Sequence, residues 1–140
     1  MLVSEVHSIN RRPERDFALV DAGFNDLMRP AMYGSYHQIS VHAPDGSDPQ
    51  GAQTRIAVAG PLCESGDVFT QNEGGVMSDQ LLPQPRIGDF LVLHNAGAYG
   101  SSMSSNYNSR PLAPEVLLDK GEARLIRRRQ TIGELLALED

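Results

Sequence analysis

Short apolar runs separated by turn signals dominate the pattern of this chain. Some runs alternate apolar with polar residues and others are apolar throughout, and glycine, proline, asparagine or aspartate follows most of them. Runs of about four to eight residues bounded in this way predict β-strands. The predicted strands are residues 3–10, 17–21, 36–42, 55–59, 90–93, 115–118 and 123–126. The last two flank Lys120-Gly121, a turn pair, and therefore predict a hairpin.

Helix is predicted only in short pieces. Asn25 is a suitable helix cap, and Pro30 is tolerated only in the first turn of a helix, so we expect two short turns that meet at the proline. If Pro30 opens the second turn, Arg29 and Tyr33, which are four residues apart, lie on the same side of it. A capping box at residues 131–134 predicts a short helix near the end of the sequence.

Many short strands with little helix predict a mostly β fold, an antiparallel Greek-key β-barrel or sandwich with short helices. A length of 140 residues suits one domain, so we expect residues 1–140 to form a single β domain. Residues 71–86 are polar and rich in glycine and proline, and are expected to form either a disordered flap or a loop that faces a partner.

Composition argues against several classes of partner and bears on the cellular compartment. The net charge of −6 argues against a nucleic-acid partner, and the basic cluster at residues 127–129 is interpreted as a strand end with solvated charges. No apolar run approaches the roughly 18 residues that cross a bilayer, and residues 1–15 contain no apolar signal core. The single cysteine, Cys63, forms no internal disulfide, which favours a reducing cytoplasm.

The histidines do not predict a metal site. His37 and His42 are five residues apart in a predicted strand, which places them on opposite faces, and His7 and His94 have no ligand type at chelating distance in the sequence. No nucleophile elbow or phosphate-loop glycine pattern is present either.

Two loops carry the residues best suited to chemistry. Residues 60–67, G-P-L-C-E-S-G-D, hold Cys63 beside Glu64 between two turn signals. Cys63 is either a buried small hydrophobic residue or a thiol displayed to a site, and Glu64 is either a solvated carboxylate or part of that site. In the second loop, Tyr99 and Tyr107 lie among Gly, Ala, Ser and Asn, whose amides and hydroxyls suit an anion; the alternative is that they pack on the end of a barrel.

Taken together, these motifs resemble the C-terminal domain of the diaminopimelate decarboxylases, which are pyridoxal-phosphate enzymes of the alanine racemase and ornithine decarboxylase fold type. The matching segments follow the order of that family along nearly the whole chain. They are residues 20–33, 60–67, 88–89, 96–100, 104–111 and 115–116. The Cys-Glu-Ser-Gly-Asp and Arg-Pro-x-x-Tyr forms resemble the diaminopimelate branch, from which ornithine-type relatives differ at these two places.

The resemblance implies a barrel docked on an N-terminal (β/α)8 barrel that supplies the lysine for the Schiff base with pyridoxal 5'-phosphate. That domain is absent from these 140 residues, and Lys120, the only lysine, lies in a predicted turn. The fragment alone is therefore expected to be inactive, and without the strand that the family's barrel borrows from the far N-terminus, a sheet edge and an apolar face are expected to be uncovered.

The resemblance also implies roles for individual residues in the conversion of meso-2,6-diaminopimelate to L-lysine and CO2. Tyr99 would donate to the cofactor phosphate and border the substrate, and Arg29 and Tyr33 would hold the distal carboxylate of the substrate. Cys63 and Glu64 would reach across a homodimer interface into the partner's site, the thiol as a candidate acid and the carboxylate beside an amino group. Two alternatives stay open: a related decarboxylase for another basic amino acid, and a non-catalytic binding or regulatory barrel.

Overall fold

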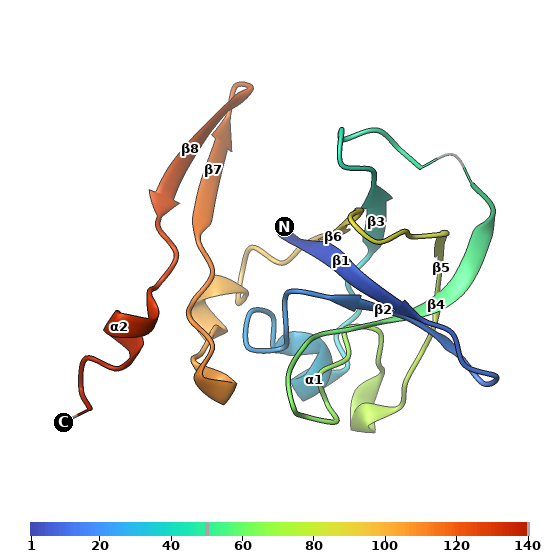
Figure 1. The fold of residues 1–140 in the computed structure, drawn as a ribbon, viewed down its shortest axis with the longest axis horizontal. Helices are drawn as coiled ribbons and strands as arrows, with labels where there is room; N and C mark the ends of the chain where they lie inside the picture. The colour runs from blue at the N-terminus through green and yellow to red at the C-terminus, as the bar shows by residue number, and fades with distance from the viewer. Residues whose placement is uncertain (50, 140) are drawn as a thin grey trace.

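The computed structural model describes residues 1–49 and 51–139. Six strands form a sheet that curves into a nearly closed barrel, and two later strands form a separate hairpin (Figure 1). The barrel strands are β1 (Leu2–Asn10), β2 (Asp16–Val20), β3 (Ile39–His42), β4 (Gln53–Ala59), β5 (Gln80–Pro83) and β6 (Phe90–Leu93). The hairpin strands are β7 (Glu115–Asp119) and β8 (Glu122–Arg127). The mostly β, barrel-like fold predicted from the sequence is confirmed.

The strand order in the barrel is β3-β6-β1-β2-β4-β5. Its two edge strands approach each other, and the Gln80 side-chain amide donates a hydrogen bond of 2.9 Å to the His37 carbonyl beside this gap. The pairs are antiparallel except that β2 and β4 run parallel, a feature that the antiparallel prediction did not contain. Parallel neighbours need a long crossover connection, and the chain between β2 and β4, which carries α1 and β3, provides it.

Alternation of apolar and polar residues sets the barrel core. Val6 in β1 is fully buried, whereas Val3 of the same strand is exposed. Ile39 and Val41 of β3 are both buried, as their alternation predicted. Each such side chain contributes about 1.5–3 kcal/mol when it is fully buried. The other buried members of the core include Ala18, Val20, Leu27, Ile56, Val58, Phe69, Leu82, Leu91 and Leu93.

The short helix α1 (Arg29–Tyr33) begins at a proline and ends at a glycine. Pro30 lies in its first turn, where the missing N–H has no helical partner to lose. Gly34 ends the helix with a φ of 60°, and a side chain there would collide with the backbone of the 72–73 segment. The prediction that Asn25 caps a helix is wrong: Met28 precedes α1 without a side-chain cap, and Asn25 lies buried in a hydrogen-bonded turn.

Residues 71–86 are more ordered than the sequence predicted. They contain β5, which pairs with β4, and a 3-10 helix at Glu73–Gly75. The alternative of a disordered flap is therefore wrong for this part, whereas the alternative of a loop that faces a partner stays a prediction. β5 has only four residues and ends in Pro83, and an edge strand of this kind tolerates a proline that would break a central strand.

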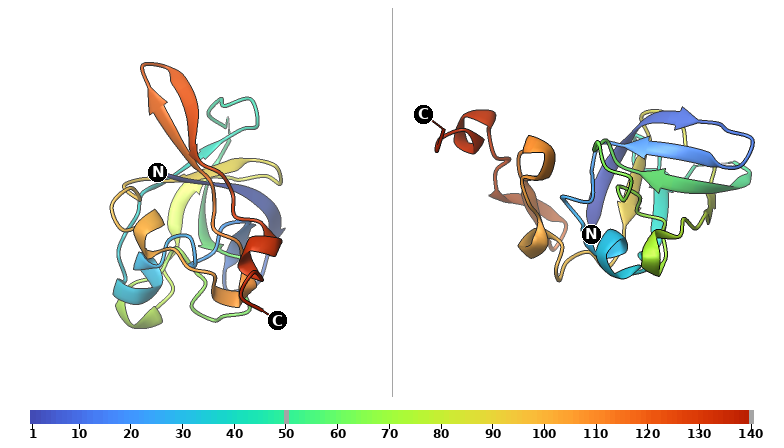
Figure 2. Two further views of the ribbon diagram at one scale, coloured as in Figure 1. Left: turned by 90° about the vertical axis from the view of Figure 1, so that its left-hand side faces the viewer. Right: turned by 90° about the horizontal axis from the view of Figure 1, so that it is seen from below.

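The hairpin of β7 and β8 stands away from the barrel, with the helix α2 (Ile132–Leu135) after it (Figure 2). Lys120 and Gly121 form its turn with positive φ angles, as predicted. The interpretation of residues 127–129 as solvated charges is wrong for Arg127, which is half-buried and donates to the Ser101 hydroxyl at 2.8 Å and the Ala113 carbonyl at 3.2 Å. No helix among the described residues is long and apolar enough to span a membrane.

The predicted capping box is present at the start of α2. The Thr131 hydroxyl accepts from the Glu134 amide at 3.2 Å, and the Glu134 carboxylate accepts from the Thr131 amide at 2.9 Å. Glu134 also pairs with the Arg128 guanidinium, and this contact, together with the Thr131 bonds, lowers the pKa of Glu134 to about 2. Interactions between residues that are close together in the sequence therefore stabilise α2.

Candidate functional site

Arg29 is placed between two tyrosines at the N-terminal end of α1. Its guanidinium carbon lies 5.8 Å from the centre of the Tyr33 ring and 5.2 Å from the centre of the Tyr99 ring. The helix brings Arg29 and Tyr33 to one side, as the four-residue spacing predicted, and the loop after β6 brings Tyr99 to them. Cations are attracted to the faces of aromatic rings at such distances, so the two rings orient the guanidinium without neutralising it.

The loop after β6 has a conformation that few sequences allow. Asn95 and Tyr99 have positive φ angles of 57° and 63°. A side chain at Gly100 would collide with the Ala96 carbonyl, so the tight turn around Tyr99 requires glycine at this position. Tyr99 is 57% exposed and lines an open cleft. Such strained turns persist where the surrounding structure holds them.

An open cleft of about 320 Å³ lies between α1 and this loop. Arg29, Tyr99 and His37 line it together with Ser35, Tyr36, Asn95 and Ala98. No carboxylate of residues 1–49 and 51–139 forms an ion pair with Arg29. A guanidinium that faces a cleft without an internal acid is suited to bind an anion, above all a carboxylate or a phosphate.

The loop at residues 60–67 displays Cys63 and Glu64 and buries Asp67. Both Cys63 and Glu64 are exposed. Asp67 is 3% exposed, and its two oxygens accept the Phe24 and Leu62 amides at 2.7 Å each. Burial raises the pKa of Asp67 above its ordinary value, although these two hydrogen bonds oppose the shift. Asp67 is therefore a buried carboxylate that ties the 60–67 loop to the segment before α1.

Glu64 is held by the second loop. The Tyr107 hydroxyl donates to Glu64 Oε2 at 3.0 Å, and the Gly66 amide donates to Oε1 at 3.0 Å. The Gly66 bond, followed by the Tyr107 bond, lowers the pKa of Glu64. Tyr107 itself packs on Phe24 with ring centres 4.9 Å apart. Tyr107 thus takes the packing role considered for both tyrosines, whereas Tyr99 faces the cleft.

The predicted residues form two separate groups within this chain. Arg29, Tyr33 and Tyr99 lie together at the cleft, and Cys63 and Glu64 lie together on the 60–67 loop. In the part of the chain that the structure describes, no hydrogen bond or ion pair joins the two groups. Within the described residues, the two groups are therefore separate from each other.

The sequence interpretation missed His37. It is 5% exposed, and its Nδ1 lies 2.9 Å from the His94 carbonyl, at the point where the Tyr99 loop begins. Its Nε2 is buried without a hydrogen-bond partner among the described residues. The only sequence signal was its place two residues before the alternating stretch of β3, which gave no reason to choose it.

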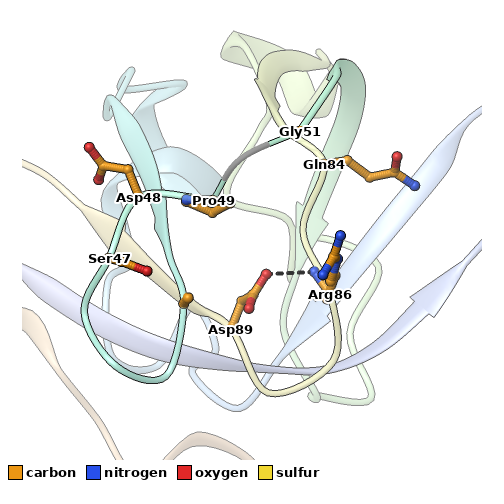
Figure 3. Close-up of a pocket in the computed structure, with 8 residues that line it drawn as sticks. Ser47, Asp48, Pro49, Gly51, Gln84, Arg86 and Asp89 are labelled. Carbon is orange, nitrogen blue, oxygen red and sulfur yellow. Dashed lines mark hydrogen bonds between the residues drawn. The ribbon is translucent and has the colours of Figure 1, made fainter.

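Other features of the surface do not coincide with these groups. A larger cleft of about 370 Å³ lies between residues 43–49 with Gly51 on one side and residues 84–89 on the other, and none of the predicted site residues lines it (Figure 3). There the Arg86 backbone amide donates to the Asp89 carboxylate at 2.8 Å. The described residues contain no cluster of three or more metal-binding side chains. Lys120 belongs to the turn between β7 and β8, and Figure 1 shows that this turn stands away from the 60–67 loop and from the loop after β6.

Comparison with known proteins gives a consistent result. Residues 1–97 match the model of the pyridoxal-dependent decarboxylase C-terminal sheet domain. The chain is 66% identical over 140 residues to diaminopimelate decarboxylase of Escherichia coli K12, which covers 99% of this chain and 33% of that protein. It is 59% identical to the protein of the same name from Streptomyces coelicolor, which covers 99% of the chain and 32% of that protein. The chain spans about a third of the length of the curated relatives it matches.

Solved structures show the same likeness. A crystal structure of diaminopimelate decarboxylase matches with a TM-score of 0.94 and 65% identity over 99% of this chain and 33% of that one. The diaminopimelate decarboxylase of M. jannaschii in complex with L-lysine matches with a TM-score of 0.86 and 37% identity over 99% of this chain and 29% of that one. A lysine decarboxylase at 24% identity and a TM-score of 0.61 shares the fold alone.

Proposed function

The chain belongs to the family of pyridoxal-dependent decarboxylase C-terminal sheet domains, and from this membership we propose that it forms the C-terminal domain of a diaminopimelate decarboxylase. The complete enzyme would convert meso-2,6-diaminopimelate to L-lysine and CO2. One observation carries the proposal: Arg29 faces an open cleft between two tyrosines, with no ion-pair partner among the described residues. The substrate has a second carboxylate, which such a guanidinium recognises, and L-lysine lacks it.

The residues present fit part of a pyridoxal-phosphate site. Tyr99 offers an exposed phenol on a tightly constrained loop, which suits a hydrogen bond to the cofactor phosphate. The chain has one lysine, Lys120, at an exposed turn, so another domain must supply the lysine that holds the cofactor. The chemistry that bound pyridoxal phosphate would supply is an electron sink for the decarboxylation. The role of this chain is to bind, orient and protonate.

Arg29 and Tyr33 would fix the distal end of the substrate. A guanidinium binds a carboxylate through two parallel hydrogen bonds, which set the direction of the ligand as well as its distance. The Tyr33 side chain is 56% exposed beside Arg29 and is able to add a phenol hydrogen bond. Binding of the distal end places the reacting end of the substrate at a defined position. This raises the reaction rate as well as the binding affinity.

Cys63 and Glu64 would act in a site of a second copy. Both are exposed on the 60–67 loop, outside the Arg29 cleft. The lowered pKa of Glu64 keeps its carboxylate charged, which suits an ammonium group of the substrate. The Cys63 thiol would donate its proton to the reacting carbon after CO2 leaves. This arrangement supports a homodimer with shared active sites.

The exposed apolar hairpin supports the need for further partners within the complete enzyme. Val116, Leu118, Leu125 and Ile126 are each more than half exposed. Apolar surface of this extent on a separate hairpin is typical of an interface, which the N-terminal barrel domain and a second subunit would cover. The exposed Cys63, with no disulfide, fits a reducing cytoplasm.

The two alternatives make different demands on Arg29. A decarboxylase for another basic amino acid would need no guanidinium for a distal carboxylate. A non-catalytic barrel would need neither the anion cleft nor a displayed thiol beside a charged carboxylate. The same cleft and loop therefore favour diaminopimelate over both alternatives.

The test uses a complete enzyme. We define the chimera as these 140 residues fused after the segment of the Escherichia coli K12 relative that precedes its matched region. We expect the chimera to release CO2 from meso-diaminopimelate and not from L-lysine or L-ornithine. Release from L-lysine or L-ornithine in preference would support another basic amino-acid decarboxylase. A folded chimera that binds pyridoxal phosphate but releases CO2 from none of them would support a non-catalytic barrel.

A further inference from the structure

His37 joins the two segments that carry Arg29 and Tyr99. Arg29 is the first residue of α1, which is followed by the connection from Gly34 to Gln38. Tyr99 lies on the loop that begins at His94. The His37 ring reaches from the first segment to the second, where its Nδ1 lies 2.9 Å from the His94 carbonyl. Beside it, the His94 amide donates to the Gln38 carbonyl at 2.8 Å. The two bonds clamp the start of the Tyr99 loop on both sides of one residue.

The His37 ring replaces a backbone donor at the end of the sheet. The pairing of β3 with β6 ends at Ile39 and Leu93, and Asn95 then turns the chain with a φ of 57°. This turn takes the His94 carbonyl out of the regular ladder of strand hydrogen bonds. A carbonyl that loses its ladder partner must find another donor or remain unpaired. His37 provides that donor at the residue where the loop leaves the sheet.

The chemistry of the bond fixes the tautomer of His37. A carbonyl oxygen only accepts, so Nδ1 must carry the proton and Nε2 is bare in the neutral ring. Nε2 is buried without a partner among the described residues, so the ring makes its one side-chain hydrogen bond to His94. The burial of an imidazole for a single hydrogen bond is a cost that pure packing would not require, since an apolar side chain would fill the same space.

We propose that His37 is a positioning residue whose bond to the His94 carbonyl sets the separation of Arg29 and Tyr99, and with it recognition of the distal carboxylate. The proposal rests on the proposed function for the identity of that ligand. His37 lines the Arg29 cleft, but its ring nitrogens are engaged or buried, so it acts through the loop and does not touch the substrate. The 5.2 Å contact of Arg29 with Tyr99 spans the same two segments as the His37 bond.

Three variants of the chimera separate this role from packing. His37→Asn places an amide N–H where Nδ1–H stands, His37→Gln places it near Nε2, and His37→Leu removes it. We expect His37→Leu and His37→Gln to raise KM for meso-diaminopimelate about tenfold with kcat changed less than about threefold, because a lost buried hydrogen bond shifts the position of a binding group. We expect His37→Asn to keep KM within about threefold of the parent.

Hydrogen–deuterium exchange gives a readout that does not depend on turnover. We expect faster exchange of the amides of residues 94–99 in His37→Leu and His37→Gln, and parent-like exchange in His37→Asn. Four outcomes would each overturn the proposal. KM is equal in all variants, glutamine rather than asparagine restores the parent KM, exchange is unchanged, or all three variants fail to fold. If the parent chimera does not turn over diaminopimelate, the proposed function fails, while the exchange pattern still decides whether His37 positions the loop.

Discussion

The Arg29 guanidinium carbon lies 5.2 Å from the centre of the Tyr99 ring, although the two residues are 70 positions apart in the chain. The ring holds the charge in place but provides no counter-charge. The barrel therefore maintains an oriented cation at the edge of an open cleft. Under the proposed function, substrate choice should therefore depend strongly on Arg29.

Replacement of Arg29 by lysine in the chimera should raise KM for meso-diaminopimelate by about tenfold to a hundredfold. Lysine keeps the charge but not the forked pair of donors, and a hydrogen bond to a charged group is worth about 1.5–3 kcal/mol. Steady-state kinetics measure the change. Arg12→Lys, at an exposed residue between β1 and β2, is the matched control and should leave KM unchanged. Unaltered kinetics in Arg29→Lys would remove the distal-carboxylate role.

Replacement of Cys63 by alanine in the chimera should lower kcat by at least about tenfold, because a positioned general acid contributes about a hundredfold or more to rate. Binding of pyridoxal phosphate, followed by visible absorbance, should survive, since the exposed thiol does not line the Tyr99 cleft. Parallel loss of turnover and of cofactor binding would show instead that Cys63 supports the structure. Cys63→Ser, which keeps a weaker proton donor, should fall between the parent and alanine.

Replacement of Asp67 by asparagine should lower the free energy of unfolding by about 1–3 kcal/mol, because the amide group accepts only one of the two N–H groups that Asp67 serves and leaves the other unpaired. Urea denaturation of the chimera measures the loss. The exposed Asp119→Asn is the control for removal of a charge and should change stability by less than about 0.5 kcal/mol.

The difference in stability between the parent and Asp67→Asn should depend on pH with a defined sign. The pKa of Asp67 is raised in the folded protein, so its ionisation opposes folding as pH rises through the interval between the ordinary and the raised value. Stability of the parent should therefore fall across this interval, relative to Asp67→Asn, as pH rises. An opposite slope would show that the hydrogen bonds to Phe24 and Leu62 outweigh burial.

Replacement of Tyr107 by phenylalanine should raise the pKa of Glu64 toward its ordinary value, because the phenol donates to its carboxylate. The Gly66 hydrogen bond should keep part of the lowering. Because the folded pKa of Glu64 lies below the ordinary value, the contribution of this bond to stability is present above the ordinary pKa and disappears as pH falls through the folded value. An NMR titration of the Glu64 carboxyl carbon in the parent and in Tyr107→Phe measures the two pKa values. Tyr36→Phe is the control. Tyr36 is exposed and lines the Arg29 cleft, so its replacement should leave the pKa of Glu64 unchanged.

Local signals predicted much of the fold. The hairpin turn at Lys120-Gly121, the capping box at Thr131 and the common side of Arg29 and Tyr33 all depend on residues within four positions of each other. Interactions of this range are set by backbone geometry and side-chain length, which the sequence contains directly.

Long-range features were not predictable in the same way. The parallel pairing of β2 with β4 depends on where a crossover of some thirty residues returns, and β5 gains its conformation from β4 rather than from its own four residues. The burial of Asp67 and the contact of His37 with His94 join segments 43 and 57 positions apart. Single-sequence patterns do not encode which distant backbone groups will need a partner.

The only lysine of the 140 residues stands at the exposed tip of the β7–β8 turn. Within this domain, an amine-reactive cross-linker can therefore attach to a side chain at one place alone. Mass-spectrometric mapping of the peptides joined to Lys120 would show which surface of the complete enzyme the hairpin tip faces, without any engineered label. In this structure the β7–β8 turn lies away from both α1 and the 60–67 loop, so a label on Lys120 leaves both groups of predicted site residues in this chain untouched (Figure 1).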